Sequence, residues 1–397
     1  MTTAVPPALA ALSRVETTDP ALSSRVDAAI DAALADRRLV GAVVLVAQDG
    51  QAVYRRAAGL ADREARRPMR EDAIFHFSSL TKPIVTAAAL RLVEEGRIAL
   101  EDPVTKYLPD FRPKLADGTE PVITLGHLLL HTAGMTYTFN EPVDGPYHQA
   151  QVSSGLDYPG LSIEDNLRRI ASVPLSFAPG TAWTYSVSLD VLGPVLAKAA
   201  GQSLPDLVRD RVTGPLGLQD TGFAPPDLAR LATPYIDGRP EPTRMAADDV
   251  TSSQSDLDGI RYSPGRIFDG GSYPSGGAGM AGTAGDFLVF LEALRQGGAP
   301  ILKRETTEAM GQNQIPGLVR EGSPGDGFGY GFAVFTDPVA AGVPQAAGSW
   351  HWGGVYGHTW SVDPVNRLTV VILTNTAIEG MAGQLKTDVL AAVYDQK

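Results

Sequence analysis

A serine and a lysine three residues apart could provide a nucleophile and its base. Ser79-Leu80-Thr81-Lys82 precedes the segment 83–95, whose alanines, leucines and valines predict a helix. Residues three apart on a helix share a face, so the Ser79 hydroxyl can meet the Lys82 amine. A serine in the first turn also lies near free backbone N–H groups, which favour developing negative charge. Burial would favour the neutral form of Lys82, which can accept the serine proton.

The tetrapeptide alone is a weak signal, because a Ser-x-x-Lys spacing also arises by chance. The alternative interpretation is that Ser78 or Ser79 caps a helix while Lys82 is solvated. Two observations favour the interpretation of Ser79 and Lys82 as a nucleophile and its base. The chain contains this pattern once, and an apolar helical segment follows it directly.

The composition limits the classes of function and partner. The 397 residues are 44% hydrophobic and 20% charged, which is typical of a globular protein with a sizeable core. A net charge of −12 argues against nucleic acid and anionic membranes as partners. The chain has no cysteine, which excludes disulfides, thiol nucleophiles and cysteine-ligated metals. With no signal peptide in Met1–Pro20 and no membrane-length apolar stretch, we expect a cytoplasmic protein; its oligomeric state stays open.

Extended segments at both chain ends predict one antiparallel sheet. Residues 40–47 and 51–57 flank Asp49-Gly50, which is a strong hairpin signal. Residues 359–362 and 368–374 flank a second turn, and helical spacing at 21–37 and 383–394 places one helix beside each hairpin. We therefore expect an α+β fold whose sheet is built from both chain ends and flanked by helices.

Helical segments fill the middle of the chain. They are predicted at residues 83–95, 125–131, 163–171 and 189–199. We expect an α/β lobe from residues 1–86 and 173–397, carrying the sheet and the terminal helices. Residues 87–172 would form an inserted, mainly helical lobe, with the active site in the cleft between the two lobes.

Four blocks in order along about 300 residues resemble the serine β-lactamase and penicillin-binding protein superfamily, in particular its class C-like branch. They are Ser79–Lys82, the Leu-Leu-Leu-His-Thr-Ala-Gly block at 128–134, the segment 177–186, and the glycine-rich segment 275–280. The resemblance implies a β-lactamase/transpeptidase-like fold and makes Tyr185 the second proton-handling group, near Ser79 and Lys82. A nearby ammonium would stabilise the phenolate, so the pair would share a proton. The alternative for Tyr185 is a plain core position.

Two departures from the family pattern favour esters over β-lactams. The usual Tyr-x-Asn is Tyr185-Ser186-Val187, without an amide side chain, and the usual Lys-Thr-Gly is Trp352-Gly353-Gly354. Replacing the lysine by an indole removes a cation that attracts carboxylates and makes the wall apolar. The Trp-Gly-Gly form resembles the family VIII carboxylesterases of the EstB type, over nearly the whole chain from about Arg25 onward.

The same resemblance implies further site residues. The backbone N–H groups of Ser79 and Val355 would form the oxyanion hole. The Gly353-Gly354 pair would let substrate approach the strand edge. Trp352 would line the acyl or alcohol pocket, and Tyr137 would border its mouth. For Trp352 and Tyr137 a structural role in the core remains the alternative.

Other kinds of site have little support. Gly-x-Ser-x-Gly, the usual esterase signature, does not occur. His127 and His131 could share a helix face, but position 128 is Leu instead of the Glu of His-Glu-x-x-His, and no third ligand is evident. We therefore expect no metal and no cofactor, with both histidines structural and His131 bonding loop backbone. By strand alternation His351 points away from Trp352 and outside the site.

The sequence thus predicts a serine carboxylesterase that hydrolyses neutral, small to medium esters through an acyl-enzyme on Ser79. Its partner would be the small-molecule ester. A β-lactamase or peptidase-like amidase and an acyltransferase on the same fold remain alternatives. A non-enzymatic sensor is disfavoured because Ser79, Lys82 and Tyr185 are all present. Whether Lys82 or Tyr185 is the primary base stays open.

Overall fold

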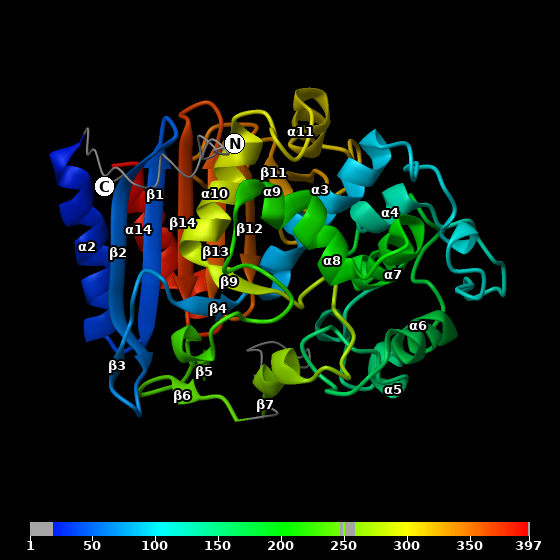
Figure 1. Ribbon diagram of the computed structural model, residues 1–397, viewed down its shortest axis with the longest axis horizontal. Helices are drawn as coiled ribbons and strands as arrows, with labels where there is room; N and C mark the ends of the chain where they lie inside the picture. The colour runs from blue at the N-terminus through cyan, green and yellow to red at the C-terminus, as the bar shows by residue number, and fades with distance from the viewer. Residues whose placement is uncertain (1–18, 247–248, 251–258, 396–397) are drawn as a thin grey trace, which may run out of the picture.

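The centre of the molecule is an antiparallel sheet in which strands from the two chain ends meet. The computed structural model describes residues 19–246, 249–250 and 259–395. The sheet has eight strands in the order β10-β11-β12-β13-β14-β1-β2-β3. Strand β1 (Gly41–Gln48) pairs with β14 (Leu368–Thr374), so the blue and red ends of the chain lie side by side in Figure 1. The expected sheet from both chain ends is confirmed.

Both predicted hairpins are present. Asp49 and Gly50 have φ of 53° and 83°, the two positive values that a tight type I′ turn requires between β1 and β2. The second turn is closed by the Asp363 carboxylate, which accepts from the N–H of Asn366 at 2.9 Å. The other strands of the sheet are β2 (Gln51–Asp62), β3 (Arg67–Pro68), β10 (Asp326–Phe328), β11 (Ala333–Phe335), β12 (Trp350–Gly354) and β13 (His358–Asp363).

One face of the sheet is covered by the two terminal helices. Helices α2 (Pro20–Ala35) and α14 (Gln384–Val393) pack against each other, close to the predicted ranges. Side chains alternate along β1, so Val44 and Val46 face this layer while Val43 and Leu45 face the opposite core. The two hydrophobic layers therefore share the same central strands.

The opposite face supports the buried helices. Helix α10 (Ala284–Arg295) packs on β1 and β14, in front of the sheet in Figure 1. Helix α3 (Thr81–Glu94) is buried at almost every position, and α7 (Ser188–Ala200) and α8 (Leu204–Val208) pack against it. A helix that is enclosed on all sides carries apolar residues all round, which explains the alanine- and leucine-rich sequence of α3.

The helix predicted at 125–131 is shorter than expected. Helix α4 spans Leu125–Leu129, because His131 adopts a left-handed φ of 56°. The imidazole of His131 instead turns toward Ser186, 55 residues further on, where it accepts from the backbone N–H at 3.2 Å. A tertiary contact therefore ends this helix.

The remaining elements are short and connect these layers. They are β4 (Ile74–His76), η1 (Ser78–Leu80), η2 (Val104–Lys106), η3 (Thr138–Asn140), α5 (Pro146–Gln149), α6 (Ile163–Ser172), η4 (Arg209–Thr213), α9 (Gly214–Leu216), η5 (Leu228–Arg230), β5 (Tyr235–Ile236), β6 (Thr243–Arg244), β7 (Asp249–Val250), β8 (Arg261–Tyr262), η6 (Pro264–Phe268), β9 (Ala281–Thr283), α11 (Arg304–Met310), α12 (Pro338–Ala341) and α13 (Glu379–Ala382).

The helical side of the molecule continues beyond the boundary expected at residue 172, since α7 and α8 pack on α3. The division into lobes 1–86 with 173–397 and 87–172 stays a prediction, and residues 1–18, 247–248, 251–258 and 396–397 of those ranges lie outside the described residues. The expectation about a signal peptide likewise concerns residues 1–18. Across the described ranges, none of the helices is both long and apolar enough to cross a membrane.

Ile30→Ala tests the layer of terminal helices. Ile30 is fully buried between α2 and the sheet, so the substitution should lower the free energy of unfolding by about 2–5 kcal/mol. Val365→Ala, at a 69% exposed turn position, is the control and should change it by less than about 0.5 kcal/mol. Urea unfolding followed by circular dichroism gives both values. Equal stabilities for the two variants would contradict this packing.

Candidate active site

Ser79 lies at a sharp junction between a short strand and the buried helix. Strand β4 pairs with β9 (Ala281–Thr283), and η1 then leads directly into α3. The chain turns at Ser78, whose φ of 45° is uncommon for a residue other than glycine. Such strained positions persist where the surrounding packing fixes them, and often at functional sites. The turn brings Ser79 against β12 at the edge of the buried core.

The structure brings the three predicted proton-handling residues together. The Ser79 Oγ and Tyr185 Oη atoms are 2.7 Å apart. The Lys82 amine donates to Ser79 Oγ at 3.1 Å and to the carbonyl oxygen of Gly277 at 2.9 Å. Lys82 is only 1% exposed. A serine hydroxyl that contacts both a phenol and a buried amine can lose its proton to either.

Tyr185 is fixed by the segment before α7 and by aromatic neighbours. Its ring centroid lies 4.9 Å from those of His131 and Tyr137 and 5.1 Å from that of Trp352. Asn140 donates from its side-chain amide to the Tyr185 carbonyl at 2.9 Å. These contacts hold the phenol in one orientation toward Ser79.

His127 and His131, the two histidines in and beside the 128–134 block, support the backbone. Burial, and then the positive charges of Lys82 and Arg320, hold the pKa of His131 well below its usual value, so the ring is neutral. His131 bonds the loop backbone at Ser186, as predicted, and His127 accepts from the N–H of Thr124 at the start of α4. Within residues 19–246, 249–250 and 259–395, no cluster of three potential metal ligands occurs.

Strand β12 runs past Ser79, and its glycines allow a close approach. A Cβ on Gly354 would lie 2.7 Å from the Phe77 carbonyl oxygen and from Ser78 Oγ. Such a distance is too short for any larger residue to fit. Val355 follows directly and is buried. The space beside Gly353 is filled instead by Met381, whose Cγ a Cβ would meet at 2.6 Å, so this glycine is required by packing.

Trp352 forms part of an aromatic wall beside Tyr185. Its ring is half-buried and lies edge-on to Phe328 at 5.5 Å. Sequence reasoning missed the guanidinium of Arg320, which lies 5.2 Å from the Trp352 ring centroid and forms an ion pair with Asp326 at 2.5 Å. His351 lies beside Lys386 and Leu390 of α14, away from the site as expected, and bonds the other oxygen of Asp326 at 3.2 Å.

Tyr137 does not border an open mouth. It is 2% exposed, stacks on Phe139 at 4.7 Å, and packs between Tyr185 and the Lys82 amine, which lies 5.4 Å from its ring centroid. Burial raises the pKa of Tyr137 well above its usual value. The expectation of a rim position is therefore corrected: this residue is part of the inner wall, because the segment carrying it folds back over Tyr185.

A buried carboxyl group also lies beside the site and was not predicted. Asp190, in the first turn of α7, is 1% exposed and accepts from Ser275 Oγ at 2.5 Å. The signal that could have revealed it is an aspartate within an otherwise apolar helical segment, five residues after Tyr185.

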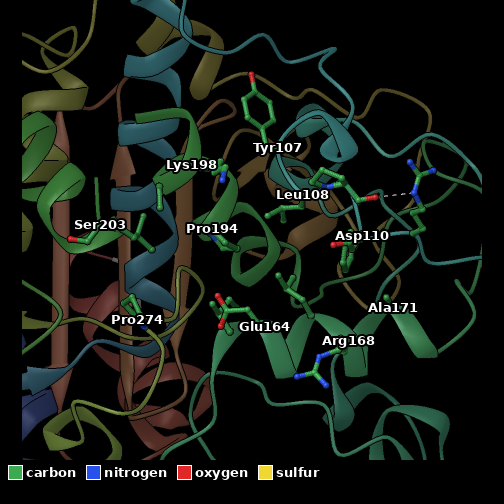
Figure 2. A pocket seen from close by; sticks show the side chains of 18 of the residues that line it. Tyr107, Leu108, Asp110, Glu164, Arg168, Ala171, Pro194, Lys198, Ser203 and Pro274 are labelled. Carbon is green, nitrogen blue, oxygen red and sulfur yellow. Dashed lines mark hydrogen bonds between the residues drawn. The ribbon is translucent and has the colours of Figure 1, made fainter. Parts of the chain in front are cut away.

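A wide groove of about 970 Å³ lies elsewhere on the helical side (Figure 2). It is bounded by α6, α7 and the loop 107–112, with Leu108 and Pro194 among its apolar residues. Ser79, Lys82 and Tyr185 do not line it. The groove is thus separate from the candidate active site.

Comparison with known proteins gives the same family as the motifs. A family model described as Beta-lactamase matches residues 26–394. The chain is 50% identical to Esterase EstB of Burkholderia gladioli over 94% of this chain and 95% of that protein. The solved structure of EstCE1, a hydrolase with promiscuous acyltransferase activity, matches with a TM-score of 0.91 and 42% identity, over 94% of this chain and 98% of that one. Monacolin J acid methylbutanoyltransferase of Aspergillus terreus is 25% identical over 85% of this chain and 87% of that protein.

Since the family model and the EstB similarity both span nearly all of the chain, this protein belongs to the beta-lactamase family, in the EstB-like branch that its Ser-x-x-Lys and Trp-Gly-Gly motifs resemble.

Proposed function

We propose that this protein is a serine carboxylesterase, with Ser79 as the nucleophile and Lys82 and Tyr185 as the groups that move its proton. One observation carries the proposal: Ser79 Oγ lies within hydrogen-bond distance of both the Tyr185 hydroxyl and the Lys82 amine. The 50% identity to an esterase supports ester hydrolysis as the reaction.

The proposed reaction has two steps. Ser79 Oγ attacks the ester carbonyl while the Lys82–Tyr185 pair takes its proton, and the oxyanion is held by the N–H groups of Ser79 and Val355. The pair then returns the proton to the leaving alcohol, and an acyl-enzyme remains. Water loses a proton to the same pair and attacks the acyl carbon. The bond from the acyl carbon to Ser79 Oγ then breaks, the pair returns the proton to Oγ, and the acid is released. Two preorganised N–H donors typically contribute several kcal/mol of transition-state stabilisation.

The substrate class follows from the wall beside Tyr185. An indole, Trp352, occupies the position where the wider superfamily places a lysine, and the nearby Arg320 charge is balanced by Asp326. No free cation therefore faces a substrate carboxylate at this wall among the described residues. We infer neutral, small to medium esters as substrates, and small molecules as partners rather than nucleic acid or membrane. The expected cytoplasmic location stays a prediction.

Acyl transfer is a second candidate. The similarity to EstCE1, a hydrolase with promiscuous acyltransferase activity, and to a methylbutanoyltransferase favours it. The acyl-enzyme is common to both reactions, and an alcohol in place of water would give a new ester. The ratio of transfer to hydrolysis at increasing alcohol concentration measures this activity.

A side-by-side assay tests the reaction class. Wild-type protein should hydrolyse a short-chain p-nitrophenyl ester rapidly and open a chromogenic cephalosporin slowly or not at all. Ser79→Ala should lose about 10³-fold or more of the esterase kcat, since the nucleophile is gone. Efficient cephalosporin turnover would instead indicate a β-lactamase, and wild-type ester turnover in Ser79→Ala would disprove the assigned nucleophile.

Tyr185→Phe tests the phenol. Removing the hydroxyl that contacts Ser79 should reduce kcat/KM by about 10²-fold or more, in the range of proton-transfer catalysis. Tyr54→Phe is the control: Tyr54 is buried, whereas Tyr185 is half-buried, and its hydroxyl bonds Asp27 on the far layer of the sheet. Its kcat/KM should stay within about threefold of wild type. Comparable losses in both variants would contradict a role for Tyr185 in proton transfer.

Gly354→Ala tests the approach of β12 to Ser79. The added methyl group would meet the Phe77 carbonyl and Ser78 Oγ, so the strand must move away from the nucleophile. We expect kcat to fall by about 10²-fold or more, as when an oxyanion donor is lost. Gly265→Ala, where a Cβ meets open space, should leave kcat unchanged. Full activity in Gly354→Ala would exclude Val355 as an oxyanion donor.

A further inference from the structure

Lys82 is a buried amine whose neighbours must come from the protein itself. The residue before α7, Val187, is apolar and buried and offers the amine no side-chain acceptor. The amine keeps Ser79 Oγ and the Gly277 carbonyl as acceptors. A charged amine at 1% exposure is costly unless an opposite charge lies close by.

Asp190 supplies that charge from the next helical turn. It lies three residues after Val187, at the start of α7, and is itself 1% exposed. Its Oδ2 faces the backbone of Gly277: a Cβ on Gly277 would lie 2.7 Å from Oδ2 and 3.2 Å from the Tyr137 hydroxyl. This oxygen makes no well-formed hydrogen bond among the described residues. The Lys82 charge acts on the same carboxylate through space, without a direct ion pair.

Ser275 connects Asp190 to the turn that holds Lys82. The Ser275 hydroxyl donates to Asp190 Oδ1 at 2.5 Å and accepts from the N–H of Ala278 at 2.9 Å. The bond from Ala278 closes the turn 275–278, and the bond to Asp190 ties this turn to α7. The Gly277 carbonyl of the same turn accepts from the Lys82 amine. Asp190 therefore acts on Lys82 in two ways: by its negative charge, and by holding the turn whose Gly277 carbonyl accepts from the Lys82 amine.

We propose that Asp190, held by Ser275, is the positioning residue that balances the charge of Lys82 and holds its amine beside Ser79. This inference rests on the proposed esterase function and assigns the residue that prepares the Lys82–Tyr185 pair for proton transfer.

The ionised carboxylate is the active form in this arrangement. The groups that face Asp190 are Lys82 from α3, Arg266 from η6, and Tyr137 and Tyr273 from the adjoining loops. Burial raises the pKa of Asp190 to about 6, while the Ser275 hydrogen bond, Lys82 and Arg266 act to lower it. The negative charge is thus present above about pH 6 and lost below it. Esterase activity that depends on this charge should fall as the pH decreases through the same range.

Asp190→Asn is the first test, with Asp157→Asn as its matched control. Asp157 is also buried, bonds a serine hydroxyl at 2.6 Å and has a pKa raised by burial, but its neighbouring cation is Arg266 instead of Lys82. We expect Asp190→Asn to reduce kcat on a p-nitrophenyl ester by about 10²-fold at pH 8, with KM within about threefold. Its pH profile should also lose the decline near pH 6 that wild type and Asp157→Asn show.

Ser275→Ala is the second test, and it tests the role of Asp190 even if Asp190→Asn does not fold. It keeps the carboxylate but removes the hydrogen bond that lowers the Asp190 pKa. The acid limb of the pH profile, that is, the decline of kcat at low pH, should therefore move to higher pH by about one unit. A purely structural role would reduce folded protein without moving this limb.

Four outcomes separate the explanations. Wild-type protein without Ser79-dependent ester turnover would overturn the proposed function and this inference with it. Wild-type turnover, combined with an unmoved acid limb in Ser275→Ala, would overturn the assignment of Asp190 alone. So would a folded Asp190→Asn variant with wild-type kcat and pH profile. The assignment of Asp190 would be established if Asp190→Asn lost the decline of kcat near pH 6 and Ser275→Ala showed that decline at a higher pH.

Discussion

The amine of Lys82 must be held inside the protein beside Ser79, and most of the site depends on this constraint. Placing such a group at 1% exposure has a desolvation cost of several kcal/mol, which only close polar partners offset. The partners come from different parts of the chain: Ser79 from η1, directly before α3, the Gly277 carbonyl from the turn 275–278, and the Asp190 carboxylate nearby. The buried amine therefore requires a rigid environment in every direction.

The fold supplies that rigidity through long-range packing. Ser79 meets Tyr185 across 106 residues, and Lys82 meets Gly277 across 195 residues, so neither contact is local. Helix α3 is enclosed by α7 and α8, while the sheet made from both chain ends supports the strand that passes Ser79. The unusual φ of Ser78 costs about 1–3 kcal/mol and is tolerated because the surrounding core fixes it. The same packing aims the Ser79 hydroxyl at Tyr185.

Local patterns made much of the fold predictable, and tertiary contacts explain the rest. The Asp49-Gly50 turn and the alternation in β1 act between neighbouring residues, so the sequence alone indicated the hairpin. The predicted end of the helix at 125–131 was wrong, because His131 leaves the helix and bonds Ser186. No local sequence pattern reveals this contact. Ser79, Lys82 and Tyr185 were found through motifs, whereas Asp190 and Arg320 were missed because their partners are distant in sequence or lie in irregular loops. Tyr137 was placed at a rim for the same reason.

If this protein is a serine esterase, esters react through a covalent intermediate on Ser79. Mass spectrometry of protein quenched in acid during turnover of a slowly deacylating ester tests it directly, with peptide mapping to locate the adduct. We expect one acyl group per chain, on the peptide that carries Ser79 and on that residue itself. An acyl group on another residue, or turnover of the ester without any adduct under conditions that trap a known acyl-enzyme, would contradict it.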